Sequence, residues 1–280
     1  MRSARHWPLC FVLLGFALFH YVTQWRPVAP PTATPLIEGR VVIAAPVLLL
    51  LFGGDRFLAA NVEVMRLAAT GVDGGMADTD YLVRAHKEVS RFNTCHEDNY
   101  YLANALLTWG GAVDEGEAVL RAATGCRFWD EWPPFFYGFN RFFFQRDVTG
   151  AVPALEEAAN RASDNAAGFR KLAVMIQAEQ IPDERLALEF LRNERDLSRD
   201  PRLKEMLTKR VTRLEGLVAL REAQRLYEER MHEPLRDPQQ LLDSGFLEAF
   251  PEDPLRLGYE FVDGRFTLKK IEMAGAENMP

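Results

Sequence analysis

The stretch that decides the fold runs from Phe135 to Ala159 and reads FFYGFNRFFFQRDVTGAVPALEEAA. Its first half is aromatic at helical spacing, and Asp147–Gly150 forms a short polar turn. Its second half places Ala151, Leu155 and Ala158 on one helix face. The pattern predicts two antiparallel helices joined by a tight turn. Hairpins of this kind stack on similar neighbours, and such stacks present binding surfaces rather than reaction centres.

A second hairpin of the same kind precedes this one. Thr94–Glu97 predicts a helix start as a capping box, in which the threonine hydroxyl and the glutamate carboxylate each satisfy a backbone N–H group. Gly110 and Gly111 turn the chain. The return helix then carries a small residue, a leucine and an alanine at helical spacing, namely Gly116, Leu120 and Ala123.

The two hairpins are offset by 35 residues, since Gly116 aligns with Ala151 and Leu120 with Leu155. This spacing, together with a small-x3-large-x2-Ala pattern on each second helix, resembles the 34-residue tetratricopeptide (TPR) repeat. We expect Leu155 to point between the helices of its hairpin and against the preceding repeat. The resemblance implies a short helical solenoid that binds protein partners.

The resemblance to TPR repeats covers residues 95–160 and continues as weaker helical pairs at 57–92 and 165–195. Two features depart from the family pattern. Asn104 occupies a position where the family prefers a small residue, and no proline closes either unit. The groove residues that grip peptides in some TPR domains are therefore not assigned from the sequence.

The segment after the long helix has a different pattern. A short leucine-rich helix ending at Gly245 precedes the loop Pro251–Pro254, and two strands then flank an Asp263-Gly264 turn. Over 222–270 this order resembles the C-terminal part of type II secretion pseudopilins, where a Pro-x-Asp-Pro loop precedes a hairpin. Some pseudopilins bind calcium in this part, which makes Asp253 and Asp263 possible ligands. The neighbouring Leu255 and Arg256 offer no ligand side chains, however, so we do not predict a calcium site.

The expected fold class is mainly α, with a short TPR-like helical-hairpin solenoid and a small C-terminal α+β hairpin module. The predicted domains are a membrane anchor (1–26), a proline-rich linker (27–40), TPR-like helical repeats (41–200), a long helix (201–233), a small C-terminal module with a β-hairpin (234–272) and a tail (273–280).

The N-terminus predicts a membrane location. Arg2 and Arg5 precede Trp7–Val22, an apolar run of sixteen residues without charge. We interpret the run as an uncleaved signal anchor, because no small-x-small cleavage motif precedes the prolines; a cleaved signal peptide is the alternative. Positive charge before the helix predicts a cytoplasmic N-terminus. We therefore expect a single pass through the inner (cytoplasmic) membrane, with the bulk of the chain facing the periplasm.

A second apolar run, Val41–Gly54, contains Pro46 and is followed by Asp55 and Arg56. At fourteen residues it is short for a membrane span, and its length favours a buried first helix or strand. The alternative is a second span, which would return the domain to the cytoplasm.

Two cysteines lie at the same end of the first hairpin, because Cys95 begins its first helix and Cys126 follows its second. They form a disulfide if their Cα atoms come within about 7 Å; free, buried thiols are the alternative. The run Cys95–Asp98 contains several potential metal ligands. Consecutive residues point around a helix axis, however, and no second Cys/His pair follows at zinc spacing, so we predict no metal site.

Phe128–Phe144 contains ten aromatic residues among seventeen. Aromatic residues at helical spacing usually belong to a core, but this number exceeds what one helix face buries. Trp129 and Trp132, which lie beside the prolines, are therefore candidates for a surface that binds a protein partner or a glycan.

Composition narrows the function. The chain is 48% hydrophobic and 26% charged, with a net charge of −7 and no basic stripe, so we expect no nucleic-acid partner. It has no phosphate-binding loop, no nucleophile elbow, no His-Glu-x-x-His motif and no dinucleotide fingerprint, so we predict no catalytic residues and no cofactor.

The sequence therefore favours a non-catalytic, membrane-anchored, TPR-like scaffold in the cell envelope that binds protein partners. One alternative is an accessory subunit of a secretion or pilus-type assembly, whose C-terminal module docks like that of a pseudopilin. A second alternative is an envelope enzyme whose site is assembled from scattered acidic residues.

Overall fold

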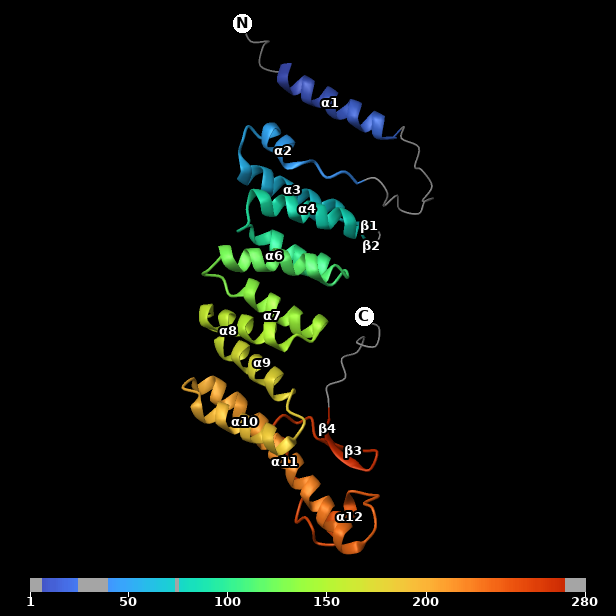
Figure 1. Ribbon diagram of the computed structural model, residues 1–280. Helices are drawn as coiled ribbons and strands as arrows, with labels where there is room; N and C mark the ends of the chain where they lie inside the picture. Colours follow the sequence, from blue (N-terminus) through green and yellow to red (C-terminus); the bar gives the residue numbers. More distant parts are fainter. Residues whose placement is uncertain (1–6, 25–39, 74–75, 270–280) are drawn as a thin grey trace. The chain divides into compact units, whose positions relative to one another are not determined.

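The computed structural model describes residues 7–24, 40–73 and 76–269, and it is mainly helical with a small two-stranded antiparallel sheet at the C-terminus (Figure 1). This agrees with the predicted class. The chain divides into two units, Met1–Val41 and Val42–Pro280. The predicted tail, 273–280, and the predicted linker, except for Arg40, lie outside the described residues.

The described part of the first unit contains one helix, α1 (Trp7–Gln24). Across the described residues, no helix combines the length and the apolarity needed to cross a membrane. At 1.5 Å per residue the 18 residues of α1 rise about 27 Å, less than the hydrocarbon core of about 30 Å, and its last turns contain the polar His20, Thr23 and Gln24. The predicted single-pass location in the inner membrane, with the bulk facing the periplasm, is therefore wrong.

The second apolar run forms a short helix, α2 (Ala45–Leu51), rather than a span. Pro46 lies in its first turn, where a proline interrupts no hydrogen bond within the helix. Leu48 is buried, and α2 packs on the two helices that follow it. The run therefore covers the edge of the first helical pair.

That pair consists of α3 (Arg56–Thr70) and α4 (Thr79–Phe92). Each helix is capped by the side chain of the aspartate before it, Asp55 or Asp78, which accepts hydrogen bonds from backbone N–H groups of the first turn. Between the helices lie two strands of two residues each, β1 (Val72–Asp73) and β2 (Met76–Ala77), which the sequence pattern did not predict.

The next hairpin contains α5 (Glu97–Leu102), the π-helical turns η1 (Ala103–Thr108) and α6 (Val113–Cys126). The predicted capping box is wrong. Thr94 follows the end of α4 closely enough for its hydroxyl to donate to the carbonyl of Ser90 at 3.0 Å, so it is not available to cap α5.

The hairpin predicted over Phe135–Ala159 is formed by α7 (Trp132–Gln145) and α8 (Val148–Arg161). Arg146 ends α7 in the left-handed conformation, and Asp147 caps α8 by accepting the N–H of Gly150 at 3.0 Å. Leu155 is fully buried, as expected for an inward position. Its hydrophobic cluster joins α7 to the helix that follows α8, however, and not to the preceding hairpin.

Three further helices continue the chain, namely α9 (Ala166–Ala178), α10 (Glu184–Leu197) and α11 (Pro201–Met231). The first helices of successive hairpins, α5, α7, α9 and α11, begin at residues 97, 132, 166 and 201, at intervals of 35, 34 and 35. The helices α4, α6, α8 and α10 begin at 79, 113, 148 and 184, at intervals of 34, 35 and 36. From α3 to α11, helices pack mainly on their neighbours in the chain.

A short helix and a hairpin follow α11. They are α12 (Gln239–Asp243), β3 (Tyr259–Val262) and β4 (Arg265–Leu268). The antiparallel register pairs Tyr259 with Leu268 and Val262 with Arg265. The turn residues Asp263 and Gly264 both have positive φ, which is the conformation that a two-residue hairpin turn requires. Phe266 is buried in the core formed by α9, α10 and α11.

Candidate functional site

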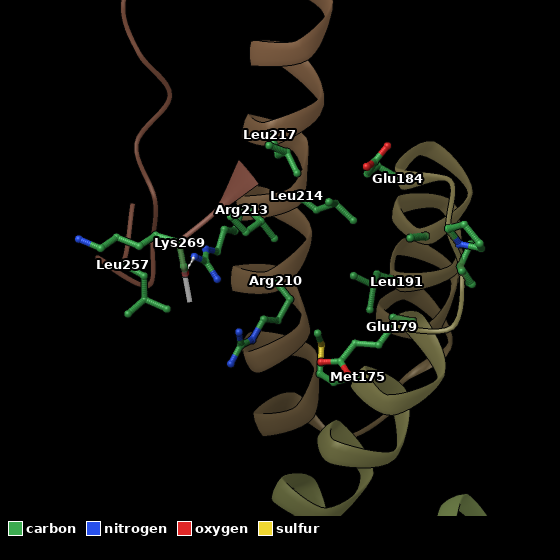
Figure 2. A pocket seen from close by; sticks show the side chains of 15 residues that line it. Met175, Glu179, Glu184, Leu191, Arg210, Arg213, Leu214, Leu217, Leu257 and Lys269 are labelled. Carbon is green, nitrogen blue, oxygen red and sulfur yellow. Dashed lines mark hydrogen bonds between the residues drawn. The ribbon is translucent and has the colours of Figure 1, made fainter. Parts of the chain in front are cut away.

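A groove of about 720 Å³ is formed by α9, α10, α11 and the C-terminal hairpin. Its apolar floor contains Met175, Leu191, Leu214 and Leu217, and its rim carries charged groups. Figure 2 shows the side chains of α9 and α10 on one side of α11 and those of Leu257 and Lys269 on the other. The volume lies in the range of pockets that hold small molecules or a few side chains of a peptide.

The hairpin approaches α11 closely because Gly216 has no side chain. A Cβ atom at that position would collide with the phenol of Tyr259, whose hydroxyl donates to the carbonyl of Arg213 at 3.0 Å. Buried leucines on different sides of α11, such as Leu207 and Leu220, belong to one hydrophobic core with α9, α10 and the hairpin.

A buried ion pair holds the loop before the hairpin in place. The guanidinium Nε of Arg213 lies 3.0 Å from Oδ2 of Asp253, and both side chains are buried. Asp253 also accepts backbone N–H groups from Leu255, Leu257 and Gly258. Burial opposes ionisation, but these N–H groups and Arg213 together hold the pKa of Asp253 below its usual value.

The considered calcium ligands therefore have other roles. Asp253 pairs with Arg213 and accepts hydrogen bonds from backbone N–H groups of its own loop. Asp263 lies in the hairpin turn. The described residues contain no group of three or more His, Cys, Asp or Glu side chains placed to hold a metal ion. In the run Cys95–Asp98, His96 instead shares a hydrogen bond of 2.9 Å between its Nε2 and Oδ1 of Asn61.

Cys95 and Cys126 are joined by a disulfide, with their Cα atoms 5.3 Å apart. The bond links the residues before α5 to the end of α6, which is the proximity expected from their positions in the hairpin. Arg127 reinforces the same junction, since its guanidinium donates to the carbonyl of Cys95 at 3.1 Å and pairs with Asp130 and Glu97.

The two tryptophans considered as a partner surface are in different environments. Trp129 is 58% exposed and lies beside the exposed Phe128, with the Arg127 guanidinium 5.5 Å from its ring centre. Trp132 is only partly exposed, and its ring packs on Phe136 and Phe169. The structure therefore does not bring the two side chains together as one platform.

Most other aromatic side chains of this region form a continuous row along α7. Phe135 stacks on Phe169 with ring centres 4.5 Å apart, and Phe139 stacks on Phe143 at 5.5 Å. Trp109, which follows η1, contacts Phe143 and extends the row. Phe169 is buried, the phenylalanines of α7 are partly exposed and Trp109 is exposed, so the row is both a contact between neighbouring hairpins and part of the surface.

The groove residues were not candidates in the sequence analysis. The sequence did contain one indication of the groove. The leucines of α11 are spread over a wider arc of the helix than packing against a single neighbour requires.

No family model, curated protein or solved structure was found to match the chain. The fold and the site together define a helical-hairpin protein with an open apolar groove beside its C-terminal hairpin.

Proposed function

We propose that the chain is a non-catalytic scaffold that binds protein partners through a short TPR-like solenoid. The observation that carries this proposal is the interval between helix starts. From α4 to α11 it stays between 34 and 36 residues, within two residues of the TPR period. The helices also pack mainly on their neighbours, as in repeat proteins, which use their stacked helices as extended surfaces for binding.

A side-chain contact between hairpins supports the same proposal. Arg161, at the end of α8, donates to the backbone carbonyls of Arg127 at 2.9 Å and of Thr124 at 3.0 Å in the preceding hairpin. Arg127, 34 residues earlier, donates instead to Cys95 of its own hairpin at 3.1 Å. The Arg161 contact joins one hairpin to the previous one, as a stack of repeats requires.

A polar pair accounts for one departure from the TPR pattern. Oδ1 of Asn104, in η1, accepts a hydrogen bond of 2.8 Å from Nδ2 of the buried Asn140, in α7. The amide pair joins the first helices of neighbouring hairpins where the family uses small residues. Asn104 is thus compatible with stacking.

Site-specific photo-crosslinking tests whether the groove binds protein. A photoreactive residue replaces Glu179, which is exposed on the rim of the groove, and in a matched protein it replaces Glu205, which is exposed on α11 outside the groove. The proposal predicts that defined proteins crosslink from position 179 in the native host and not from position 205.

A groove variant supplies the control for this experiment. Leu257→Asp places a charge in the groove wall and should abolish the crosslinks from position 179, while circular dichroism confirms that the chain remains helical. Identical crosslinking patterns from positions 179 and 205 would contradict the proposal.

A second candidate function is an accessory subunit of a secretion or pilus-type assembly. The observation that favours it is the clamp between Asp253, in the Pro-x-Asp-Pro loop, and Arg213, because the clamp joins loop, hairpin and long helix into one module. This candidate predicts that a photoreactive group at Val262, which is 47% exposed on β3, captures assembly subunits. A crosslink from Glu179 alone, with none from Val262, argues against it.

A further inference from the structure

Two half-buried cations lie beside the groove without an acceptor among the described residues. Arg210 projects from α11 on the side where Leu257 and Lys269 lie (Figure 2). Lys171 lies one helical turn before the groove residue Met175 on the same face of α9, which packs on α11, so it adjoins the groove without lining it. Burial, and then the charge of Arg210, lower the pKa of Lys171. Burial and the neighbouring Arg213 lower the pKa of Arg210, with Asp253 opposing.

The other arginines and lysines differ from Lys171 and Arg210 in their exposure or in their partners. Among the described residues of the second unit, every other arginine that is not exposed has a hydrogen-bond acceptor or an ion-pair partner, and every other lysine is exposed. These paired arginines are Arg66, Arg127, Arg141, Arg161, Arg170, Arg195, Arg213 and Arg221. Lys171 and Arg210 are therefore exceptions, and they are neighbours.

The acidic groups around the groove do not neutralise the positive charges of Lys171 and Arg210. Asp253 is engaged by Arg213, and Glu184 pairs with Arg221 and Arg265. Glu179, on the rim, is exposed and forms no ion pair with a described residue. Holding a cation out of water without a counter-charge costs free energy, so the pair does not stabilise the folded chain by itself.

We propose that the groove binds an acidic segment of a partner protein. A carboxylate of that segment lies between Lys171 and Arg210, and an adjacent apolar side chain lies on the floor formed by Met175, Leu191 and Leu214. The inference deepens the proposed function and rests on it. Its basis is charge complementarity, since two cations that have no acceptor among the described residues adjoin an open apolar surface.

Peptide selection tests the chemistry of the occupant directly. Random twelve-residue peptides displayed on phage are selected on the full-length protein and, in parallel, on the double variant Lys171→Gln/Arg210→Gln. We expect wild-type pools enriched in Asp or Glu next to Leu, Ile, Met or Phe, and no such enrichment with the variant. Each single variant should weaken a selected acidic peptide roughly tenfold or more, and added salt should weaken it further.

Thermal unfolding distinguishes a binding role from a structural one. Because each substitution removes a half-buried cation without an acceptor, Lys171→Gln and Arg210→Gln should leave the Tm unchanged or raise it. A clear fall in Tm would mean that the cations support the fold and would overturn the inference. Lys209→Gln is the matched control, because Lys209 is exposed on the same helix and should change neither Tm nor peptide affinity.

The remaining outcomes separate this inference from the proposed function. Selection of neutral or basic peptides, or equal binding of acidic peptides to wild type and double variant, would overturn the acidic preference. Crosslinks from position 179 would then still support a protein-binding groove. If neither the enrichment of acidic peptides nor the crosslinks from position 179 were observed, both the proposed function and the inference would be contradicted.

Discussion

The imidazole of His86 is enclosed between α4 and α5, where its Nδ1 lies 2.8 Å from the side-chain oxygen of Asn99. Its Nε2 is buried and has no hydrogen-bond partner among the described residues. Since Oδ1 of Asn99 is an acceptor, Nδ1 carries a proton. Burial lowers the pKa of His86 to about 4, although the Asn99 hydrogen bond acts in the opposite direction.

This pKa predicts an acid-sensitive fold. The folded value lies below the unfolded value of about 6.5, so the unfolded chain binds the proton more readily. The stability contributed by neutral His86 is complete above pH 6.5 and is lost as the pH falls toward 4, by up to about 3 kcal/mol. Denaturant unfolding across this range should show the loss. His86→Gln should flatten it, whereas His232→Asn, at an exposed position, should not.

A second residue-scale prediction concerns the packing of α8. Leu155 is fully buried among Phe135 and Phe142 of α7 and Ala173 and Ile176 of α9, so Leu155→Ala should cost roughly 2–5 kcal/mol. The matched changes Glu156→Ala and Glu157→Ala remove only solvent-facing ion pairs and should cost about 0.5 kcal/mol or less. Urea unfolding measures all three. Equal costs would mean that α8 faces the other way.

At the scale of elements, local chemistry explains most of what the sequence predicted. The helix from Pro201 to Met231 begins where the predicted long helix (201–233) begins, because Asp200 caps it and Pro201 fits its first turn, and it ends two residues earlier than predicted. The hairpin at Asp263-Gly264 likewise follows from turn chemistry. The π-helical turns at Ala103–Thr108 were not predicted, since they depend on the close packing of Thr108 against Gly116 in another helix.

The disulfide predicts that the stability of the chain depends on an oxidised α5–α6 hairpin. Its loop spans a sequence separation of 31, for which the chain-entropy model gives a stabilisation of about 3–4 kcal/mol. Reduction, or Cys95→Ser with Cys126→Ser, should lower the Tm accordingly, whereas Cys10→Ser should not. Thiol labelling of the folded, non-reduced protein checks the bond itself. Rapid alkylation of both cysteines, or a Tm insensitive to reductant, would contradict it.

At the scale of the whole molecule, sequence periodicity predicted helical hairpins but not the groove. Its walls come from α9, α10, α11 and the strand ending at Leu268, and no local pattern indicates that these segments meet. The membrane prediction failed for a different reason. It interpreted an apolar run of sixteen residues as a membrane anchor, although the helix that contains this run, α1, is shorter than the hydrocarbon core.

Hydrogen exchange of the backbone amides tests most directly whether protein partners bind at the groove of the stacked hairpins. It is measured on the full chain, alone and with the partner captured at position 179. We predict slower exchange in α9, in the first half of α11 and in the loop 251–258, with α3 and α4 unchanged. Slower exchange confined to α3 and α4, with the groove unaffected, would contradict a binding site there.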